Sequence, residues 1–400
     1  EGVTENMKIT KVEVLKVKTT RATWRPVFCR IYTDEGIYGD GEAALAYGRA
    51  ADAGFAAVKE FASLIIGMDP LKNEVIWEKL YKSTFWGQNG GPVIFAAIGA
   101  IDIALWDIKG KFYNAPIHAL LGGARRDKLR SYASQLQNGW EYGNDNYTFQ
   151  YSPEDFAEAA KKAVAEKYDA VKFDFFEKKP EGGDYVQEDR RCFVLPKDLH
   201  VIEDRLAAVR EAVGPDVDII AEAHSRMDAP GAIRYAKILE KYDVMFFEEP
   251  DTPTPYMTKY IADQVNIPIA GGERVYGRWQ FVPYFEDRSL QVIQPDLGNC
   301  GGFTEVKKIC DMAHAYDVSV QAHICASPLS TTAAIHLEAV LPNFVIHEHH
   351  ICNRITYNMG LTTVDEQPVD GFLKVPDAPG LGNEISEKAY KMADAFAVVE

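Results

Sequence analysis

The sequence predicts an α/β fold, in which a (β/α)8-type, TIM-like barrel follows an α+β capping domain at the N-terminus. First, 400 residues with 47% apolar content are too many for one small core, which favours a large domain and a smaller one. Second, from about residue 129 the chain repeats a strand, a loop and a helix eight times. Third, seven of the eight predicted barrel strands end in an ionisable residue.

The first module combines strands with helices. Residues 8–18 and 27–33 have the alternating polarity of half-buried strands, and residues 34–36 (DEG) suit a hairpin turn. Three segments after these strands carry apolar residues at helical spacing and are predicted to be helices: 49–66, 70–84 and 93–113. These elements define a capping domain over residues 7–125, which we expect the Pro- and Gly-rich tail, about 355–400, to complete. The residues before Met7 are interpreted as a leader or a loose end.

Residues 126–354 form the predicted barrel, modified from the ideal pattern and carrying the metal site. Its strands are expected at 129–134, 168–174, 217–223, 244–249, 267–272, 290–295, 318–323 and 344–348. They are too apolar to face solvent, as in a parallel sheet covered by helices. An open doubly wound sheet is the alternative, but it would need a Gly-rich turn after the first strand, where the chain reads SYASQLQNG. The polar segment 175–197 is expected to be a loop over the barrel mouth.

Composition excludes several classes of function. A net charge of −16 argues against binding to nucleic acid. No apolar run approaches the roughly 20 residues of a membrane span, and no signal peptide is recognisable, so we expect a cytoplasmic protein. The six cysteines, which include no C-x-x-C pair, are expected to be reduced thiols rather than disulfides or a zinc site: 29, 192, 300, 310, 325 and 352.

Three glutamates stand at the ends of consecutive predicted strands. Glu222 and Glu248 are 26 residues apart, and Glu248 and Glu273 are 25 apart, which is about one barrel unit. They should therefore lie on one rim, the face where barrel enzymes keep their sites. Three close carboxylates repel one another unless a hard cation binds between them, so we predict one Mg²⁺ per subunit. For any one glutamate, the alternative is a salt bridge to a nearby Lys or Arg.

Two histidines at strand ends are candidate acid–base groups. His323 follows Asp296 by one barrel unit, and a carboxylate on one ring nitrogen raises the basicity of the other. His224 is two residues beyond Glu222, so both side chains point to the same face. The alternative is that each is a hydrogen-bonded histidine without a catalytic role. Packing and loop roles are expected for the three histidines near the last strand: 347, 349 and 350.

Several motifs resemble those of the enolase superfamily, in its mandelate racemase subgroup. They are residues 101–123 (IDIALWDIKGKFYNAPIHALLGG), Glu248-Glu249-Pro250, Gly272-Glu273-Arg274 and Gln294-Pro295-Asp296. Within this subgroup the chain is most similar to the galactonate dehydratase family. That family places an acidic ligand and a catalytic histidine in the pattern of Glu222-Ala223-His224, and a His–Asp pair on strands seven and six.

The resemblance implies a Mg²⁺-dependent acid sugar dehydratase. Such an enzyme removes the C2 proton of an aldonic or aldaric acid and eliminates the C3 hydroxyl, giving a 2-keto-3-deoxy acid. His323 would take the proton with support from Asp296, and His224 would protonate the leaving hydroxyl. Lys172 would be a second positive partner of the substrate carboxylate, and Glu348 would hydrogen-bond one of its oxygens.

Two departures from the family pattern bear on the reaction. Glu222 stands where most relatives have Asp, which would displace the ion slightly. Lys172-Phe173-Asp174 replaces the Lys-x-Lys of the racemases, so His323 is the one obvious base and a racemase is disfavoured. A cycloisomerase would not need His224, and a catalytically silent member is a further alternative. A mannonate or gluconate dehydratase is also kept as an alternative. The mannonate relatives have a Tyr and Arg base arrangement, and the long loop contains three such residues: Tyr185, Arg190 and Arg191.

The capping domain is expected to read the distal part of a small-molecule sugar acid. The candidate loops cover residues 20–25, 44–49 and 85–90. Trp24, Tyr47 and Trp86 could pack on a sugar chain, and Asp174 is a fourth candidate for substrate binding. Packing at the domain junction is the alternative for the aromatic residues. The resemblance also implies a homo-oligomer, between a dimer and an octamer, and no nucleic-acid or membrane partner.

Overall fold

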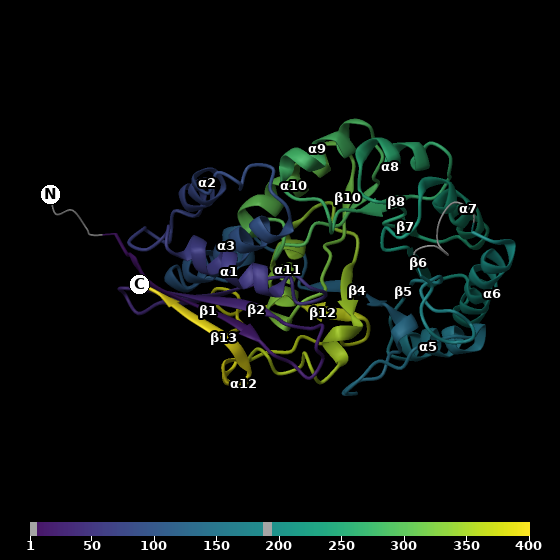
Figure 1. Cartoon of the computed structure of the whole chain (residues 1–400), viewed down its shortest axis with the longest axis horizontal. Helices are drawn as coiled ribbons and strands as arrows, with labels where there is room; N and C mark the ends of the chain where they lie inside the picture. Colours follow the sequence, from purple (N-terminus) through teal and green to yellow (C-terminus); the bar gives the residue numbers. More distant parts are fainter. Residues whose placement is uncertain (1–5, 187–193) are drawn as a thin grey trace.

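The computed structural model describes residues 6–186 and 194–400, and it opens with a four-stranded antiparallel sheet. The strand order is β13-β1-β2-β3. Its members are β1 (Ile9–Val17), β2 (Val27–Thr33), β3 (Tyr38–Ala43) and the last strand of the chain, β13 (Ala393–Val399). Figure 1 shows the yellow C-terminal strand beside the purple N-terminal ones, and the pairing of Val12 with Val399 confirms that contact.

Helices α1 (Ala51–Ala62), α2 (Asn73–Ser83) and α3 (Pro92–Phe112) complete the N-terminal unit. The long α3 begins with Pro at its first turn and packs directly on β3. Two glycines make this approach close enough. A Cβ atom on Gly41 would lie 1.9 Å from the carbonyl oxygen of Ala100, and one on Gly39 would lie 2.1 Å from that of Ala104. Any larger side chain at these positions would therefore push α3 off the sheet.

The second unit alternates strands and helices. Its strands are β4 (Lys128–Ser134), β5 (Ala170–Phe173), β6 (Asp218–Glu222), β7 (Phe246–Glu248), β8 (Ile269–Gly271), β9 (Val292–Ile293), β10 (Ser319–Val320) and β11 (His347–His350). Each overlaps a predicted strand, although most are shorter, and β11 extends past its predicted end. The helices between them are α5 (Pro153–Ala165), α6 (Pro196–Val213), α7 (Ala229–Leu239), α8 (Pro255–Ala262), α9 (Arg278–Glu286), α10 (Gly302–Ala315) and α11 (Pro328–Val340).

The strands form a barrel with all their C-terminal ends on one rim. They pair in parallel in the order β11-β4-β5-β6-β7-β8-β9-β10. A parallel bridge between Val320 and Phe344 then joins β10 to the segment before β11 and closes the ring. After β11, the 3₁₀ helix η4 (Ile351–Arg354) stands where an eighth α-helix would follow in an ideal barrel. The predicted fold class is confirmed.

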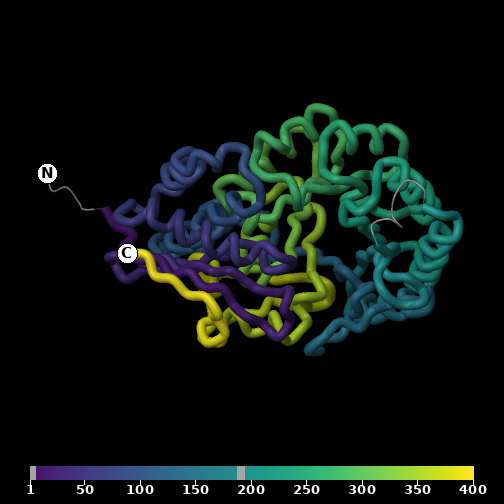
Figure 2. Tube along the Cα trace, viewed as in Figure 1, coloured from purple at the N-terminus to yellow at the C-terminus, as the bar shows by residue number. Residues whose placement is uncertain are grey.

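The C-terminal tail connects the two units. β12 (Phe372–Lys374) pairs antiparallel with β4 of the barrel, whereas α12 (Glu387–Lys391) and β13 lie on the N-terminal sheet side. The yellow part of the tube in Figure 2 follows this path back to the purple strands. No helix in the described parts of the chain is long and apolar enough to cross a membrane.

His336 on α11 is buried where this tail meets the short helix α4 (Ile117–Leu120). Its Nδ1 accepts the backbone N–H of His118 at 3.3 Å, and its Nε2 donates to the carbonyl of Leu381 at 2.9 Å. Both bonds are satisfied by the neutral ring. Burial disfavours the charged ring and lowers the pKa of His336 to about 4.

We therefore expect the protein to lose stability in mild acid. Between pH 6.5 and about 4 the unfolded chain takes up a proton at this position and the folded chain does not, so stability falls as the pH falls. The loss through this window should reach about 3 kcal/mol. His336→Gln, which can form both bonds, should flatten the dependence, measured by urea unfolding at several pH values. His314→Gln, on the exposed side of α10, is the control and should keep the pH dependence of the wild type. If the stability of His336→Gln depends on pH as steeply as that of this control, the assignment is wrong.

Candidate active site

Three carboxylates meet at the barrel mouth. Glu222 ends β6 and Glu248 ends β7, where they are paired across the sheet, and Glu273 lies two residues beyond β8. One oxygen of each lies within 4.8 Å of the others. Among the described residues, Glu222 Oε2 and Glu248 Oε2 are buried without a hydrogen-bond partner. Unpartnered carboxylate oxygens are costly to bury, and oxygen ligands at this spacing suit a hard divalent cation such as Mg²⁺.

Lys172 on β5 balances part of this charge. Its Nζ lies 2.8 Å from Glu248, 2.9 Å from Glu348 and 3.5 Å from Glu222. Each of the three glutamates thus has the ion pair that the alternative interpretation expects, since Arg274 also lies 3.3 Å from Glu273. Lys172 is nevertheless shared by three carboxylates, and Arg274 also pairs with Glu249, so a net negative charge is left. Burial lowers the pKa of Lys172, but the surrounding carboxylates raise it well above its usual value. Burial, and then the charge of Glu248, raises the pKa of Glu222. A cation would relieve both effects.

His323 follows β10 and faces the carboxylates. Its Nδ1 lies 2.8 Å from Asp296 Oδ2, and its Nε2 lies 3.5 Å from Glu273 Oε2. The other Asp296 oxygen accepts the N–H of Gly298 at 2.8 Å, which fixes the carboxylate. Burial lowers the pKa of His323, but Glu273 and Asp296 outweigh burial and raise it well above its usual value. The predicted His–Asp pair is therefore assembled, with Nδ1 donating to Asp296 and Nε2 directed toward the mouth.

His224 has a parallel arrangement on the opposite side of the rim, because three strands separate β6 from β10 in either direction around the ring. Its Nδ1 lies 3.2 Å from Asp174 Oδ2, and its Nε2 lies 3.3 Å from Gln135 Nε2. The backbone at His224 is left-handed, with φ of 47°, a strained conformation for a residue with a side chain. Glu222 Oε1 holds it by accepting the His224 N–H at 2.7 Å. Asp174, predicted to bind substrate, is buried behind the histidine and positions it.

Glu348 in β11 is held by three donors. One oxygen accepts from Ser134 Oγ at 2.6 Å and from Lys172 at 2.9 Å, and the other accepts the Ile324 N–H at 2.9 Å. Burial raises the pKa of Glu348, but Lys172 and then His323 outweigh burial and hold it below its usual range. An ionised carboxylate accepts hydrogen bonds and does not donate them. The predicted bond to a substrate carboxylate requires the protonated form, so this arrangement favours a role in positioning Lys172.

A cavity of about 480 Å³ joins these residues to the capping domain. Trp24 and Tyr47, which form a bridge between two predicted loops, line it from the cap. Trp24 is almost completely buried and donates its Nε1–H to Asn358, so it also serves as packing. Trp86 is outside the cavity lining and 75% exposed, with Phe85 as its ring contact.

Sequence reasoning missed several residues that the fold brings to the cavity. They include Gln135, Tyr147, Lys178 and Arg226, whereas Arg21, which also lines the cavity, lies in the predicted loop 20–25. Gln135 directly follows the first barrel strand, and that position was the available signal. Lys178 lies in the segment predicted to cover the mouth.

The remaining predicted residues are divided between core and cavity. Tyr185 is buried against Phe176, and its hydroxyl donates to Asp198 at 3.3 Å, so it is not at the cavity. The other two residues of that alternative, Arg190 and Arg191, and also Cys192, lie outside the described residues. The five other cysteines are free thiols. His347 and His349 are buried, as expected for packing, whereas His350 lines the cavity.

Comparison with known proteins places this geometry in a family. The model of the mandelate racemase/muconate lactonizing enzyme N-terminal domain matches residues 4–122, and the enolase C-terminal domain-like model matches residues 155–389. The chain is 35% identical to D-galactonate dehydratase of Pectobacterium atrosepticum over 386 residues, covering 94% of this chain and 93% of that protein.

A solved structure is also similar along the whole length. It is a member of the enolase superfamily from Salmonella Typhimurium, with 48% identity, a TM-score of 0.95 and coverage of 98% of this chain and 100% of that one. The resemblance inferred from the motifs is thereby confirmed. The chain belongs to the enolase superfamily, in its mandelate racemase/muconate lactonizing enzyme subgroup.

Proposed function

We propose that this protein is a Mg²⁺-dependent hydro-lyase that removes water from an aldonic or aldaric acid and releases a 2-keto-3-deoxy acid. The observation that carries the proposal is the presence of two histidines at one cavity, each with Nδ1 on its own carboxylate. His323 is paired with Asp296, and His224 with Asp174. Elimination of water needs both a base and an acid, and this site offers one group for each task. The 35% identity to D-galactonate dehydratase supports the same reaction class.

Binding begins with the substrate carboxylate at the inner end of the cavity. Lys172 is held as an ammonium by Glu248 and Glu348, so it attracts the carboxylate and is not available as a base. A Mg²⁺ ion held by the three glutamates would supply the positive charge that stabilises the negative charge developing on that carboxylate. The cavity of about 480 Å³, which Tyr47 and Trp24 line from the cap, offers room for the polyhydroxy chain.

The residues then move two protons. A cation held by Glu273 would offset the charge that raises the pKa of His323 and would favour the neutral ring. In that form His323 Nε2 accepts the proton from C2, and Asp296 stabilises the imidazolium that results. The electron pair of the broken C–H bond first moves into the substrate carboxylate and then forms the C2=C3 double bond as the C3–O bond breaks. His224 donates a proton to the departing hydroxyl, which leaves as water. The enol product then takes up a proton at C3 and loses the proton of its C2 hydroxyl, which gives the 2-keto-3-deoxy acid.

Replacement of His224 tests the role of the leaving-group acid. In D₂O, His224→Asn should still exchange the C2 proton of a bound sugar acid, because His323 is intact, but should dehydrate it about 10²- to 10⁴-fold more slowly. Exchange is followed by ¹H NMR and dehydration by the semicarbazone of the keto acid. His200→Asn, on the exposed face of α6, is the matched control. Dehydration at the wild-type rate in His224→Asn would remove His224 from this role.

A screen of sugar acids, rather than the geometry of the site, identifies the stereochemistry of the substrate. We expect one or a few stereoisomers in a set of aldonic and aldaric acids to react with Mg²⁺ present, and D-galactonate is the first to test. A chain that turns over none of them would be a catalytically silent member. A lactone product instead of a keto acid would indicate a cycloisomerase.

A further inference from the structure

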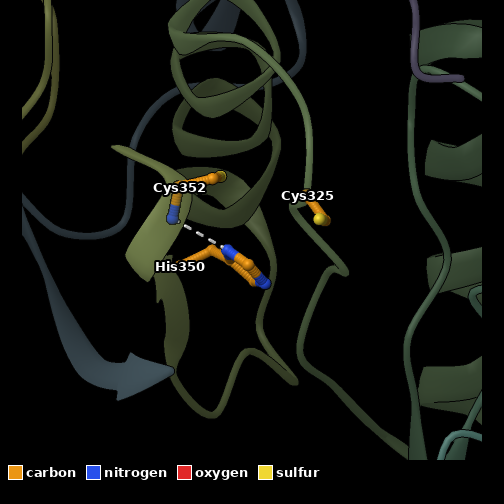
Figure 3. A group of neighbouring side chains, drawn as sticks. All are labelled: Cys325, His350 and Cys352. Carbon is orange, nitrogen blue, oxygen red and sulfur yellow. Dashed lines mark hydrogen bonds between the residues drawn. The ribbon is translucent and has the colours of Figure 1, made fainter. Parts of the chain in front are cut away.

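Two thiols and an imidazole gather at the barrel mouth outside the mechanism just described. Cys325 follows β10, His350 ends β11 and Cys352 lies in η4, so the three come from neighbouring elements on the rim (Figure 3). One donor atom of each lies within 4.8 Å of the others. Cys352 is fully buried, whereas Cys325 is partly exposed and lines the cavity together with His350.

The position of this cluster follows from the chain itself. Cys325 is two residues beyond His323, and His350 is two residues beyond Glu348. In a strand such as β11, side chains two residues apart point to the same side, as for Glu348 and His350. The segments that carry the proposed base and Glu348 therefore also carry these soft donors, one step further out. Cys325 and Cys352 are 27 residues apart, about one barrel unit, which no zinc-finger spacing would match.

The donor set differs chemically from the three glutamates. Thiolate and imidazole ligands select Zn²⁺ and other thiophilic cations, whereas carboxylates suit Mg²⁺. His350 Nδ1 accepts the backbone N–H of Cys352 at 3.0 Å, so this nitrogen carries its lone pair and no proton (Figure 3). An ion would take that lone pair in place of one hydrogen bond and would displace the thiol protons. The open side toward the cavity would hold a fourth ligand, such as water.

We propose that Cys325, His350 and Cys352 form a second metal site, selective for thiophilic divalent cations such as Zn²⁺, and that an ion bound there inhibits the enzyme. The ion would stand in the cavity beside His323 and Glu348 and would obstruct the sugar chain. The inhibitory part rests on the proposed function. The binding part does not, because it depends on the three donors alone.

Cobalt binding tests the site without any assay of turnover. Protein saturated with Mg²⁺ is titrated with Co²⁺, and absorption is followed in the region of thiolate-to-cobalt charge transfer. We expect one equivalent to produce this band and Zn²⁺ to abolish it. Carboxylate ligands cannot produce such a band, so the glutamates do not interfere. Cys325→Ala and Cys352→Ala should each lose most of the intensity, whereas Cys310→Ala, another fully buried thiol, should retain it.

The outcomes separate the two parts of the proposal. A band of wild-type intensity in both cysteine variants, or no band in the wild type, overturns the site. If Cys352→Ala does not fold, Cys352→Ser and Cys325→Ala decide the same question. In turnover assays, Zn²⁺ should inhibit the wild type and Cys310→Ala. The Zn²⁺ concentration that halves their activity should be at least tenfold lower than the one that halves the activity of Cys352→Ala. Equal inhibition of all three overturns the inhibitory part, and absence of any turnover counts against the proposed function while the cobalt band still reports the site.

Discussion

Replacing His323 by Asn is expected to abolish both C2 proton exchange and dehydration, each falling about 10²- to 10⁴-fold. Asp296 fixes one ring nitrogen of His323 at 2.8 Å, and the other lies 3.5 Å from Glu273, a proposed metal ligand. A substrate bound to the ion would therefore present its C2 proton to this nitrogen. Asn keeps the approximate size of the side chain but cannot accept the proton.

The measurement separates His323 from His224. Exchange and dehydration are compared by ¹H NMR in D₂O for the wild type, His323→Asn and His224→Asn. Loss of both activities in the first variant, with exchange retained in the second, assigns the base and the acid. If His323→Asn still exchanges the proton, another base operates on the substrate. The rates of exchange and dehydration in Asp296→Asn should lie between those of the wild type and those of His323→Asn. This substitution leaves the imidazole ring in place but removes the charge that stabilises the imidazolium.

The positions of the strand-end residues could be predicted because a barrel repeats at a nearly constant interval. Glu222, Glu248 and Glu273 occur at that interval, and closure of the ring then places them on one rim whatever the details of the helices. The same argument located His323 and Asp296. Most strands are shorter than predicted because the apolar runs continue past the regular ladder. In β9 only Val292 and Ile293 are paired.

Side-chain contacts between different strand–helix repeats of the barrel could not be predicted in this way. The pairing of Asp174 with His224 depends on the left-handed turn after β6, which His224 and Ser225 form without the glycine that would have indicated it. The three-donor fixation of Glu348 requires Ser134 from the opposite end of the barrel sequence. The cysteine–histidine cluster was missed because metal-site spacing rules apply to short loops, whereas Cys325 and Cys352 meet through the closure of the ring. Trp86 is exposed because its loop does not fold over the mouth.

Replacing Glu222 by Gln should remove the response to Mg²⁺ without unfolding the protein. In the wild type, Mg²⁺ at 100 times its dissociation constant should stabilise the fold by about 2.7 kcal/mol, measured by thermal or urea unfolding. Gln retains an oxygen to accept the N–H groups of Ala223 and His224, at 3.0 and 2.7 Å, so the turn after β6 should persist. It removes the buried charge whose Oε2 has no hydrogen-bond partner among the described residues and only the ammonium of Lys172 at 3.5 Å. Activity should fall by about 10³-fold, since metal charge stabilisation contributes several kcal/mol.

The stability of the metal-free protein tests the role of Glu222 more directly. Because burial and Glu248 disfavour the charge on Glu222, Glu222→Gln should be at least as stable as the wild type in the presence of a chelator. Glu338→Gln is the matched control, since Glu338 is equally buried but bonds His347 at 2.5 Å outside the carboxylate group. It should lose stability with or without the ion and keep its Mg²⁺ response. If Glu222→Gln is instead less stable in chelator and still gains stability from Mg²⁺, then Lys172 alone balances the site and the ion binds elsewhere.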